Sequence, residues 1–164
     1  MKKLWAPWRI KYVAKTQSKG CVLCRAYKRK NDTKNYIVLR SKYCFVLLNT
    51  FPYNNGHIMV VPNRHIASLE FLSTQEMLDM NKTLVTMIRV LRKVLRPHGF
   101  NVGINLGRVS GAGIDKHLHM HLVPRWSGDT NFMPVVAHTK VISQSLHSLQ
   151  GEIKKYVSRY VEKS

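Results

Sequence analysis

The sequence predicts a single α+β domain built around an antiparallel sheet. Three observations lead to this fold class. The length of 164 residues suits one domain. Patterns typical of strands and helices follow one another in the order strands, helix, strands, helix, and a tight-turn signal rather than a crossover helix joins the first two strand patterns. We therefore expect one antiparallel sheet, one long central helix and a C-terminal helix.

The first pair of predicted strands spans Tyr43–Leu48 and His57–Val61. The connection between them ends in Asn55-Gly56, two residue types that tolerate positive φ and favour a turn between antiparallel strands. Before this pair, residues 25–35 are polar and indicate an exposed loop.

A long amphipathic helix is predicted to begin at Ser73. Ser73 and Glu76 have the spacing of a capping box, and Pro97 with Gly99 is expected to end the helix. Apolar residues recur every three or four positions and predict a buried stripe, in which methionine acts as core filler. The stripe consists of Met77, Met80, Leu84, Met87, Ile88, Leu91, Val94 and Leu95.

Two further strands and a last helix complete the predicted fold. The strands are Phe100–Leu106 and His117–Val123, and the helix is Leu146–Val161. Residues 107–113, between the strands, contain too much glycine for regular structure.

No linker or internal repeat divides the chain, so residues 1–164 form one predicted domain. Within it we distinguish a basic N-terminal arm (1–20), a core (21–136) and a C-terminal helical extension (137–164). The arm contains apolar residues among its lysines, which suggests that it docks on the core.

The chain is strongly basic, since 27 Lys and Arg against 8 Asp and Glu give a net charge of +19. Residues 1–42 hold 13 of these basic residues and a single acid, Asp32, so the segment carries 13 − 1 = +12. Such a surface attracts polyanions. Nucleic acid and a small phosphate-rich substrate are the two partners to distinguish.

The sequence carries no sign of a membrane or secreted protein. No stretch approaches the roughly 18 uninterrupted apolar residues of a membrane span. The N-terminus lacks the continuous apolar run of a signal peptide. Three cysteines are too few, and odd in number, for a secreted disulfide framework. We therefore expect a cytoplasmic protein without a membrane partner.

Three histidines at every second position form the strongest chemical signal. Side chains alternate across a strand, so His117, His119 and His121 are expected on one face, with the residues between them facing the core. Two chemistries fit, namely a metal site with H-x-H ligands and attack on phosphorus by a neutral imidazole. His57 and the amides of the glycine-rich loop favour a phosphate substrate, because Asp115 is the only carboxylate nearby in sequence.

Cys21 and Cys24 form a C-x-x-C pair. In a reducing compartment such a pair binds metal or performs redox chemistry. A thioredoxin-like redox site would follow a strand, and no strand pattern precedes this pair, so metal binding is favoured. Cys44 lies in an apolar run and is expected in the core.

The segment His117–Val123 resembles the signature H-φ-H-φ-H-φ-φ, with φ apolar, of the histidine triad (HIT) family of nucleotide hydrolases and transferases. Other segments resemble a microbial subgroup related to diadenosine tetraphosphate phosphorylases and hydrolases: Leu4–Arg9, Asn49–Val61, Gly103–Arg108 and Pro124–Pro134. The resemblance implies a HIT-like fold and an enzyme that cleaves dinucleoside polyphosphates, or related nucleotidyl substrates, at the α-phosphate.

The resemblance also implies roles for the matching residues. His119 would attack the α-phosphorus to form a nucleotidyl-histidine intermediate, which water or phosphate then resolves. His121 and His57 would bind phosphate oxygens and, when protonated, offset the charge that develops. The other nucleotide-binding residues implied by the resemblance are Asn49 for the ribose and, beside His121, Asn105 and the amides around Gly111 for the phosphate.

Zinc-bearing members of the family hold the metal with residues that match Cys21, Cys24, His65 and His117. Two thiolates and two imidazoles suit tetrahedral zinc with no open position, so the implied zinc site is structural. Members of the family usually join their sheets in pairs, which implies a homodimer.

Three alternatives stay open. One is a nucleoside phosphoramidate hydrolase with the same nucleophile. Another is a nucleic-acid-binding module that uses residues 1–42, with the triad as a nucleotide-sensing pocket. The last is a mononuclear metallohydrolase with His117, His119 and His121 as ligands. It is less favoured because the outer Cα atoms of such a strand lie roughly 13 Å apart.

Overall fold

The structure is a computed structural model that describes residues 20–129 and 142–161. The predicted arm up to residue 19 and the predicted boundary between residues 136 and 137 lie outside the described residues. The same holds for the C-terminal part of Pro124–Pro134.

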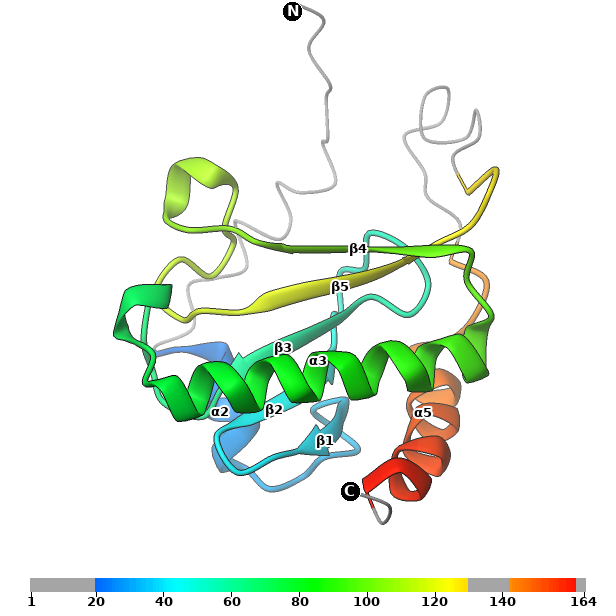
Figure 1. Ribbon diagram of the computed structural model, residues 1–164, viewed down its shortest axis with the longest axis horizontal. Coiled ribbons are helices and arrows are strands. Elements are labelled where there is room, and N and C mark those ends of the chain that lie inside the picture. The colour runs from blue at the N-terminus through cyan, green and yellow to red at the C-terminus, as the bar shows by residue number, and fades with distance from the viewer. Residues whose placement is uncertain (1–19, 130–141, 162–164) are drawn as a thin grey trace, which may run out of the picture.

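A five-stranded sheet forms the centre of the protein (Figure 1). In chain order the strands are β1 (Ile37–Arg40), β2 (Cys44–Leu48), β3 (Ile58–Pro62), β4 (Gly99–Ile104) and β5 (Met120–Arg125). Their order across the sheet is β1-β2-β3-β5-β4, and every neighbouring pair is antiparallel. The predicted α+β fold class is confirmed.

The predicted hairpin joins β2 to β3. The two strands pair without a break from Cys44 opposite Pro62 to Leu48 opposite Ile58. Gly56 takes a φ of +75° in the connection, as its place in the turn signal predicts. The hairpin therefore delivers the next residue, His57, to the start of β3.

The two predicted helices are α3 (Thr74–Leu95) and α5 (Leu146–Val161). The capping box of α3 is present, since the Ser73 hydroxyl accepts from the backbone N–H of Glu76 and the Glu76 carboxylate accepts from that of Ser73. Met80 and Met87 are buried, but Met77 is 41% exposed. The predicted apolar stripe is therefore too wide at its N-terminal end.

Helices cover both faces of the sheet. On one face, α3 and α5 pack against inward residues such as Val46 and Val60. Alternate residues such as Phe45 point to the other face, where Leu23 of α2 (Val22–Lys28) covers them. In Figure 1, α3 runs across the sheet and α2 lies behind it.

Two short elements, α2 and β1, were not predicted. The predicted exposed loop at residues 25–35 is wrong in its first part, because α2 extends to Lys28 and buries Ala26. Seven residues in α2 and four in β1 are too few for a periodic pattern. Contact with the sheet stabilises these segments instead.

The last strand starts later than predicted. The prediction His117–Val123 began three residues before β5, which starts at Met120. The backbone N–H of Leu118 donates to the segment after β3 at 2.6 Å, and the backbone carbonyl of His117 accepts from the His119 ring. These backbone groups therefore take no part in the ladder between β3 and β5.

Two 3-10 turns complete the described structure, η2 (Leu69–Phe71) and η3 (Arg108–Ser110). The second turn lies inside residues 107–113, where the sequence analysis expected no regular structure. Within the described ranges, no helix combines the length and the apolar character needed to cross a membrane.

Candidate active site and metal site

Three histidines meet where β3 and β5 lie side by side. His57 immediately precedes β3, His119 immediately precedes β5, and His121 is the second residue of β5. The ring centroids of His57 and His121 are 5.0 Å apart, and those of His119 and His121 are 4.8 Å apart. His57 and His119 are buried, whereas His121 is half-buried. The structure thus brings together the residues expected to be catalytic.

Hydrogen bonds hold the His57 ring in one tautomer. The backbone N–H of Tyr53 donates to Nδ1 of His57 at 3.0 Å, so Nδ1 carries a lone pair and the proton sits on Nε2. That Nε2–H donates to Nδ1 of His121 at 2.9 Å. Neutral His121 must then carry its own proton on Nε2, at the end of its ring remote from the contact with His57.

The His119 ring is held in the opposite tautomer. Its Nδ1–H donates to the backbone carbonyl of His117 at 2.8 Å, which leaves a lone pair on Nε2. Burial lowers the pKa of His119, while the bond to the carbonyl acts in the other direction. His119 is therefore neutral near pH 7, with the unprotonated nitrogen that a nucleophile requires.

His57 is neutral as well. Burial, followed by the nearness of His121 and His119, lowers the pKa of His57 to about 3. In this geometry the low pKa favours the neutral form of His57, and its role toward a charged substrate stays a prediction. His57 orients the ring of His121 through the hydrogen bond between them.

The ring of His117 belongs to a separate cluster. Its Nε2–H donates to the backbone carbonyl of Pro62 at 3.0 Å, and its Nδ1 lies 3.3 Å from Sγ of Cys21. The three alternating histidines therefore do not converge on one ion. The alternative of a mononuclear metallohydrolase built on them is not supported.

Asn49 connects the histidines to the neighbouring cavity. It follows β2, and its Nδ2 lies 3.3 Å from Nδ1 of His57. Its Oδ1 accepts from the backbone N–H of Phe51 at 2.9 Å, which fixes the side chain. Asn49 also lines the cavity, so a ligand there lies next to the histidines.

The other two expected nucleotide-binding residues lie in the segment after β4. Asn105 directly follows Ile104, which pairs with Met120, so Asn105 lies near the start of β5. The backbone N–H of Gly111 donates to the carbonyl of Arg108 at 3.1 Å, which closes η3. That amide is already engaged, and a phosphate here would have to bind other amides of the loop.

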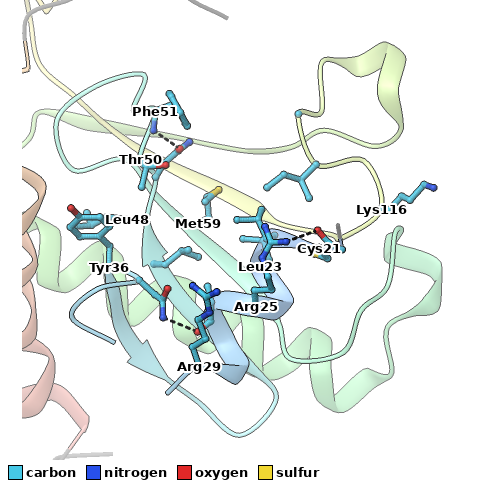
Figure 2. Close-up of a pocket in the computed structure, with 18 of the residues that line it drawn as sticks. Cys21, Leu23, Arg25, Arg29, Tyr36, Leu48, Thr50, Phe51, Met59 and Lys116 are labelled. Carbon is cyan, nitrogen blue, oxygen red and sulfur yellow. Dashed lines mark hydrogen bonds between the residues drawn. The ribbon is translucent and has the colours of Figure 1, made fainter. Parts of the chain in front are cut away.

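A cavity of about 800 Å³ opens beside Asn49 (Figure 2). Its apolar lining comes from α2, β2, β3 and the segment before β5, and includes Leu23, Ala26, Leu47, Met59 and Ile114. Polar and cationic side chains lie along the same lining, namely Arg25, Arg29, Lys34, Asn35 and Lys116. An apolar cavity with a few polar groups suits a flat heterocycle such as a nucleobase.

The four residues expected to bind metal form a compact group, and two of them, Cys21 and His65, also line this cavity. The ligand atoms of Cys21, Cys24, His65 and His117 all lie within 4.8 Å of one another. The sulfur of Cys24 lies 3.3 Å from Nδ1 of His65 and 3.4 Å from Nδ1 of His117, and the two nitrogens are 3.2 Å apart. In a tetrahedral zinc site, bonds of about 2.0 Å to nitrogen and about 2.3 Å to sulfur place the ligand atoms roughly 3.3–3.8 Å apart. The three separations of 3.2–3.4 Å lie near the short end of this range.

The sequence analysis missed two parts of the site. One is the backbone N–H of Tyr53, which sets the His57 tautomer, and no sequence signal marks a backbone donor. The other is the cavity wall formed by α2, including Leu23 and Arg29. Its only signal was the C-x-x-C pair at the start of the helix.

Comparison with known proteins agrees with this arrangement. The HIT domain family matches residues 30–128, which is more than half of the chain. The AP-4-A phosphorylase of Mycobacterium tuberculosis is 40% identical over 154 residues, covering 89% of this chain and 79% of that protein.

Two solved structures share the fold. A Zn-bound histidine triad family protein from Mycobacterium smegmatis has a TM-score of 0.71 at 19% identity, with 88% of this chain and 98% of that chain covered. A hypothetical histidine triad nucleotide-binding protein from Sulfolobus tokodaii has a TM-score of 0.70 at 22% identity, with 85% and 93% covered. With its alternating histidines, its antiparallel sheet and these matches, the chain belongs to the HIT family.

Proposed function

We propose that this protein transfers a nucleotidyl group from a dinucleoside polyphosphate, of the diadenosine tetraphosphate kind, through a covalent intermediate on His119. One observation carries the proposal. The hydrogen bond from Nδ1–H of His119 to the carbonyl of His117 leaves Nε2 of His119 unprotonated. The ring centroid of His119 lies 4.8 Å from that of His121. Asn49 places a cavity of nucleoside size next to these histidines.

In the first step, Nε2 of His119 attacks the α-phosphorus. A P–N bond forms and the P–O bond to the rest of the polyphosphate breaks, so the leaving group departs with the electron pair. The Nε2–H of His121 donates to a phosphate oxygen and stabilises the charge that develops there. His57 holds His121 in the tautomer that makes this donation possible.

In the second step, an acceptor oxygen attacks the same phosphorus and His119 leaves. The name of the relative that is 40% identical favours inorganic phosphate as the acceptor. Diadenosine tetraphosphate and phosphate would then give ATP in the first step and ADP in the second. With water as the acceptor, the second product would be AMP.

The same proposal includes structural zinc at Cys21, Cys24, His65 and His117. The chemistry of the donor set and its spacing support zinc, which when bound would hold α2 against the sheet. Because four protein ligands fill a tetrahedral ion, these residues would take no direct part in the transfer.

We also propose a homodimer in which the β4 edges of two sheets join. β4 is the last strand of the sheet, and its Val102 is 49% exposed. On α3, Leu78 and Val85 are 54% and 45% exposed. These exposed apolar residues support a contact between copies of the chain.

The decisive experiment measures products from diadenosine tetraphosphate with and without inorganic phosphate. Wild type should release ADP and ATP only when phosphate is present, and His119→Ala should show no turnover. The matched control is His147→Ala, which removes an exposed histidine of α5 and should keep wild-type activity. Full activity of a folded His119→Ala protein would refute the covalent mechanism, whereas phosphate-independent release of AMP would change the acceptor to water.

A further inference from the structure

Asn35 presents a fixed hydrogen-bond acceptor to the cavity. Its Nδ2 donates to the backbone carbonyls of Asn31 at 2.8 Å and of Ala26 at 3.2 Å. Two carbonyl oxygens require the nitrogen of the amide, so the orientation of the side chain is settled. Asn35 is half-buried in the cavity lining, and Oδ1 is the polar atom that it has left to offer a ligand.

The loop that carries Asn35 is well anchored. Its backbone N–H donates to the carbonyl of Asn31 at 3.1 Å. The guanidinium of Arg40 donates to the carboxylate of Asp32 at 2.7 and 3.0 Å, and Gln150 of α5 donates to the backbone carbonyl of Asp32 at 2.7 Å. Because Oδ1 of Asn35 is already held in place, binding a ligand there requires no further loss of side-chain conformational entropy.

Arg29 supplies hydrogen-bond donors to the same cavity. It is the C-cap residue of α2, one turn after Ala26, and it lines the cavity. Figure 2 shows Arg29 reaching from α2 toward the part of the cavity that Met59 lines. Within residues 20–129 and 142–161, no carboxylate forms an ion pair with Arg29. A guanidinium offers donors only, so the ligand atom that it meets must be an acceptor.

The order of groups in a nucleotide settles which part of the ligand meets these two residues. With the α-phosphorus at His119, the ribose follows at Asn49, and the base enters the cavity between β3 and α2. The polar side chains on the α2 side of the cavity then face the edge of the base. This placement rests on the proposed function.

We propose that Asn35 and Arg29 read the edge of the base, and that they hold adenine through its 6-amino group and a neighbouring ring nitrogen. The 6-amino group of adenine donates to Oδ1 of Asn35, and an adjacent ring nitrogen accepts from Arg29. Adenine places a ring acceptor on both sides of its amino group, at N1 and at N7. Guanine can also meet the pair, with its N1–H toward Oδ1 of Asn35 and its O6 accepting from Arg29, so the contrast that the pair makes is with a purine that lacks the 6-amino group.

Calorimetric binding of AMP and three analogues to the full chain tests the proposal without any turnover. Purine riboside 5′-monophosphate lacks the amino group, and the 1-deaza and 7-deaza analogues of AMP each lack one ring acceptor. We expect the loss of the amino group to weaken binding about tenfold. One of the two deaza analogues should lose a similar factor, which would identify the edge that faces Arg29.

The substitution Arg29→Gln tests the donor. Arg29→Gln should weaken AMP binding about tenfold. It should leave unchanged the affinity for the deaza analogue that binds wild type more weakly than AMP, because that analogue already lacks the ring nitrogen that accepts from Arg29. The matched control is Lys28→Gln, which removes the same charge from the same helix at an exposed residue outside the cavity lining. The control should change every affinity less than about twofold.

Three results would overturn the proposal. They are equal binding of all four nucleotides to wild type, an equal effect of Arg29→Gln and Lys28→Gln on every nucleotide, and no binding of AMP. The test is separable from the proposed function, because turnover requires His119 and binding does not. If the protein distinguishes AMP from its analogues but does not turn over diadenosine tetraphosphate, the proposed reaction is rejected and base recognition stands. If it turns over this substrate but binds AMP and the analogues equally, base recognition is rejected and the reaction stands.

Discussion

The backbone carbonyl of His117 accepts the Nδ1 proton of His119 at 2.8 Å, while the ring of His117 lies 3.3 Å from the sulfur of Cys21. A single residue therefore connects the group of two cysteines and two histidines to His119, the proposed nucleophile. Order in the group of cysteines and histidines helps to fix the carbonyl that selects the His119 tautomer.

Removal of the proposed metal ligand Cys24 should destabilise the protein. We expect Cys24→Ser to lose bound zinc, measured by elemental analysis of the purified protein. If zinc binds the folded state alone, its loss removes about 4 kcal/mol of folding free energy at a free zinc concentration roughly 1,000 times the Kd. Urea unfolding with and without a chelator measures this difference.

Cys44 offers the control for this experiment. It is buried, lies outside the metal-binding group and has a pKa raised to about 12 by burial. Cys44→Ala should therefore retain one zinc per chain. Equal zinc content in wild type and Cys24→Ser would exclude the proposed ligand set.

Titration of His57 should make the fold acid-sensitive. The pKa of His57 is about 3 in the folded protein against 6.5 for an ordinary histidine, so the unfolded chain takes up the proton first as the pH falls. The stabilising contribution is complete above pH 6.5 and is lost progressively toward pH 3. By pH 5 this residue alone should cost about 2 kcal/mol of folding free energy.

Urea unfolding at several pH values checks this expectation. His57→Gln should show a shallower loss of stability between pH 6.5 and pH 5 than wild type, whatever its stability at neutral pH. His147→Gln, an exposed substitution on α5, should keep the wild-type slope. Parallel slopes for wild type and His57→Gln would assign the acid sensitivity to other groups.

The turn before His57 should tolerate no side chain at Gly56. A Cβ there would overlap Cδ1 of Leu95 and lie 3.1 Å from Cγ of Pro124, and the residue has a φ of +75°. We expect Gly56→Ala to lower the free energy of unfolding by about 3 kcal/mol through strain and overpacking together.

Gly128 separates the two causes. It has the same φ of +75°, and a Cβ there would meet no atom of the described residues within 4 Å. Gly128→Ala should therefore cost only the backbone strain, about 1 kcal/mol. Equal losses for the two variants in urea unfolding would show that contact with Leu95 contributes nothing.

The long helix illustrates what local sequence determines. The capping box at Ser73 and Glu76 and the spacing of Met80 and Met87 depend on residues within a few turns, and the structure confirms them. The exposure of Met77 does not follow from the helical period, because the period defines a face but not the width that the sheet covers.

The alternating histidines illustrate what tertiary contacts decide. The alternation of side chains correctly separates core residues such as Leu118 from the histidines. It does not show at which residue β5 begins to pair with its neighbouring strands. His119 bonds to the backbone carbonyl of His117, and this local bond replaces strand pairing. For the same reason the sequence could suggest a catalytic role for His57 but not its tautomer, which depends on the amide of Tyr53, nor the low pKa that burial gives it.

The C-terminal helix α5 has a consequence for synthesis of the chain on the ribosome. Gln150 donates to the backbone carbonyls of Asp32 and Ile37, more than 110 positions earlier in the sequence, and Leu149 and Ile153 of α5 are completely buried in the main core. Contacts between such distant parts of a chain form only after both have been made. The part of this face that α5 covers, beside β1, therefore stays exposed until residues 146–161 have emerged, although α3 can already pack on the rest of the face.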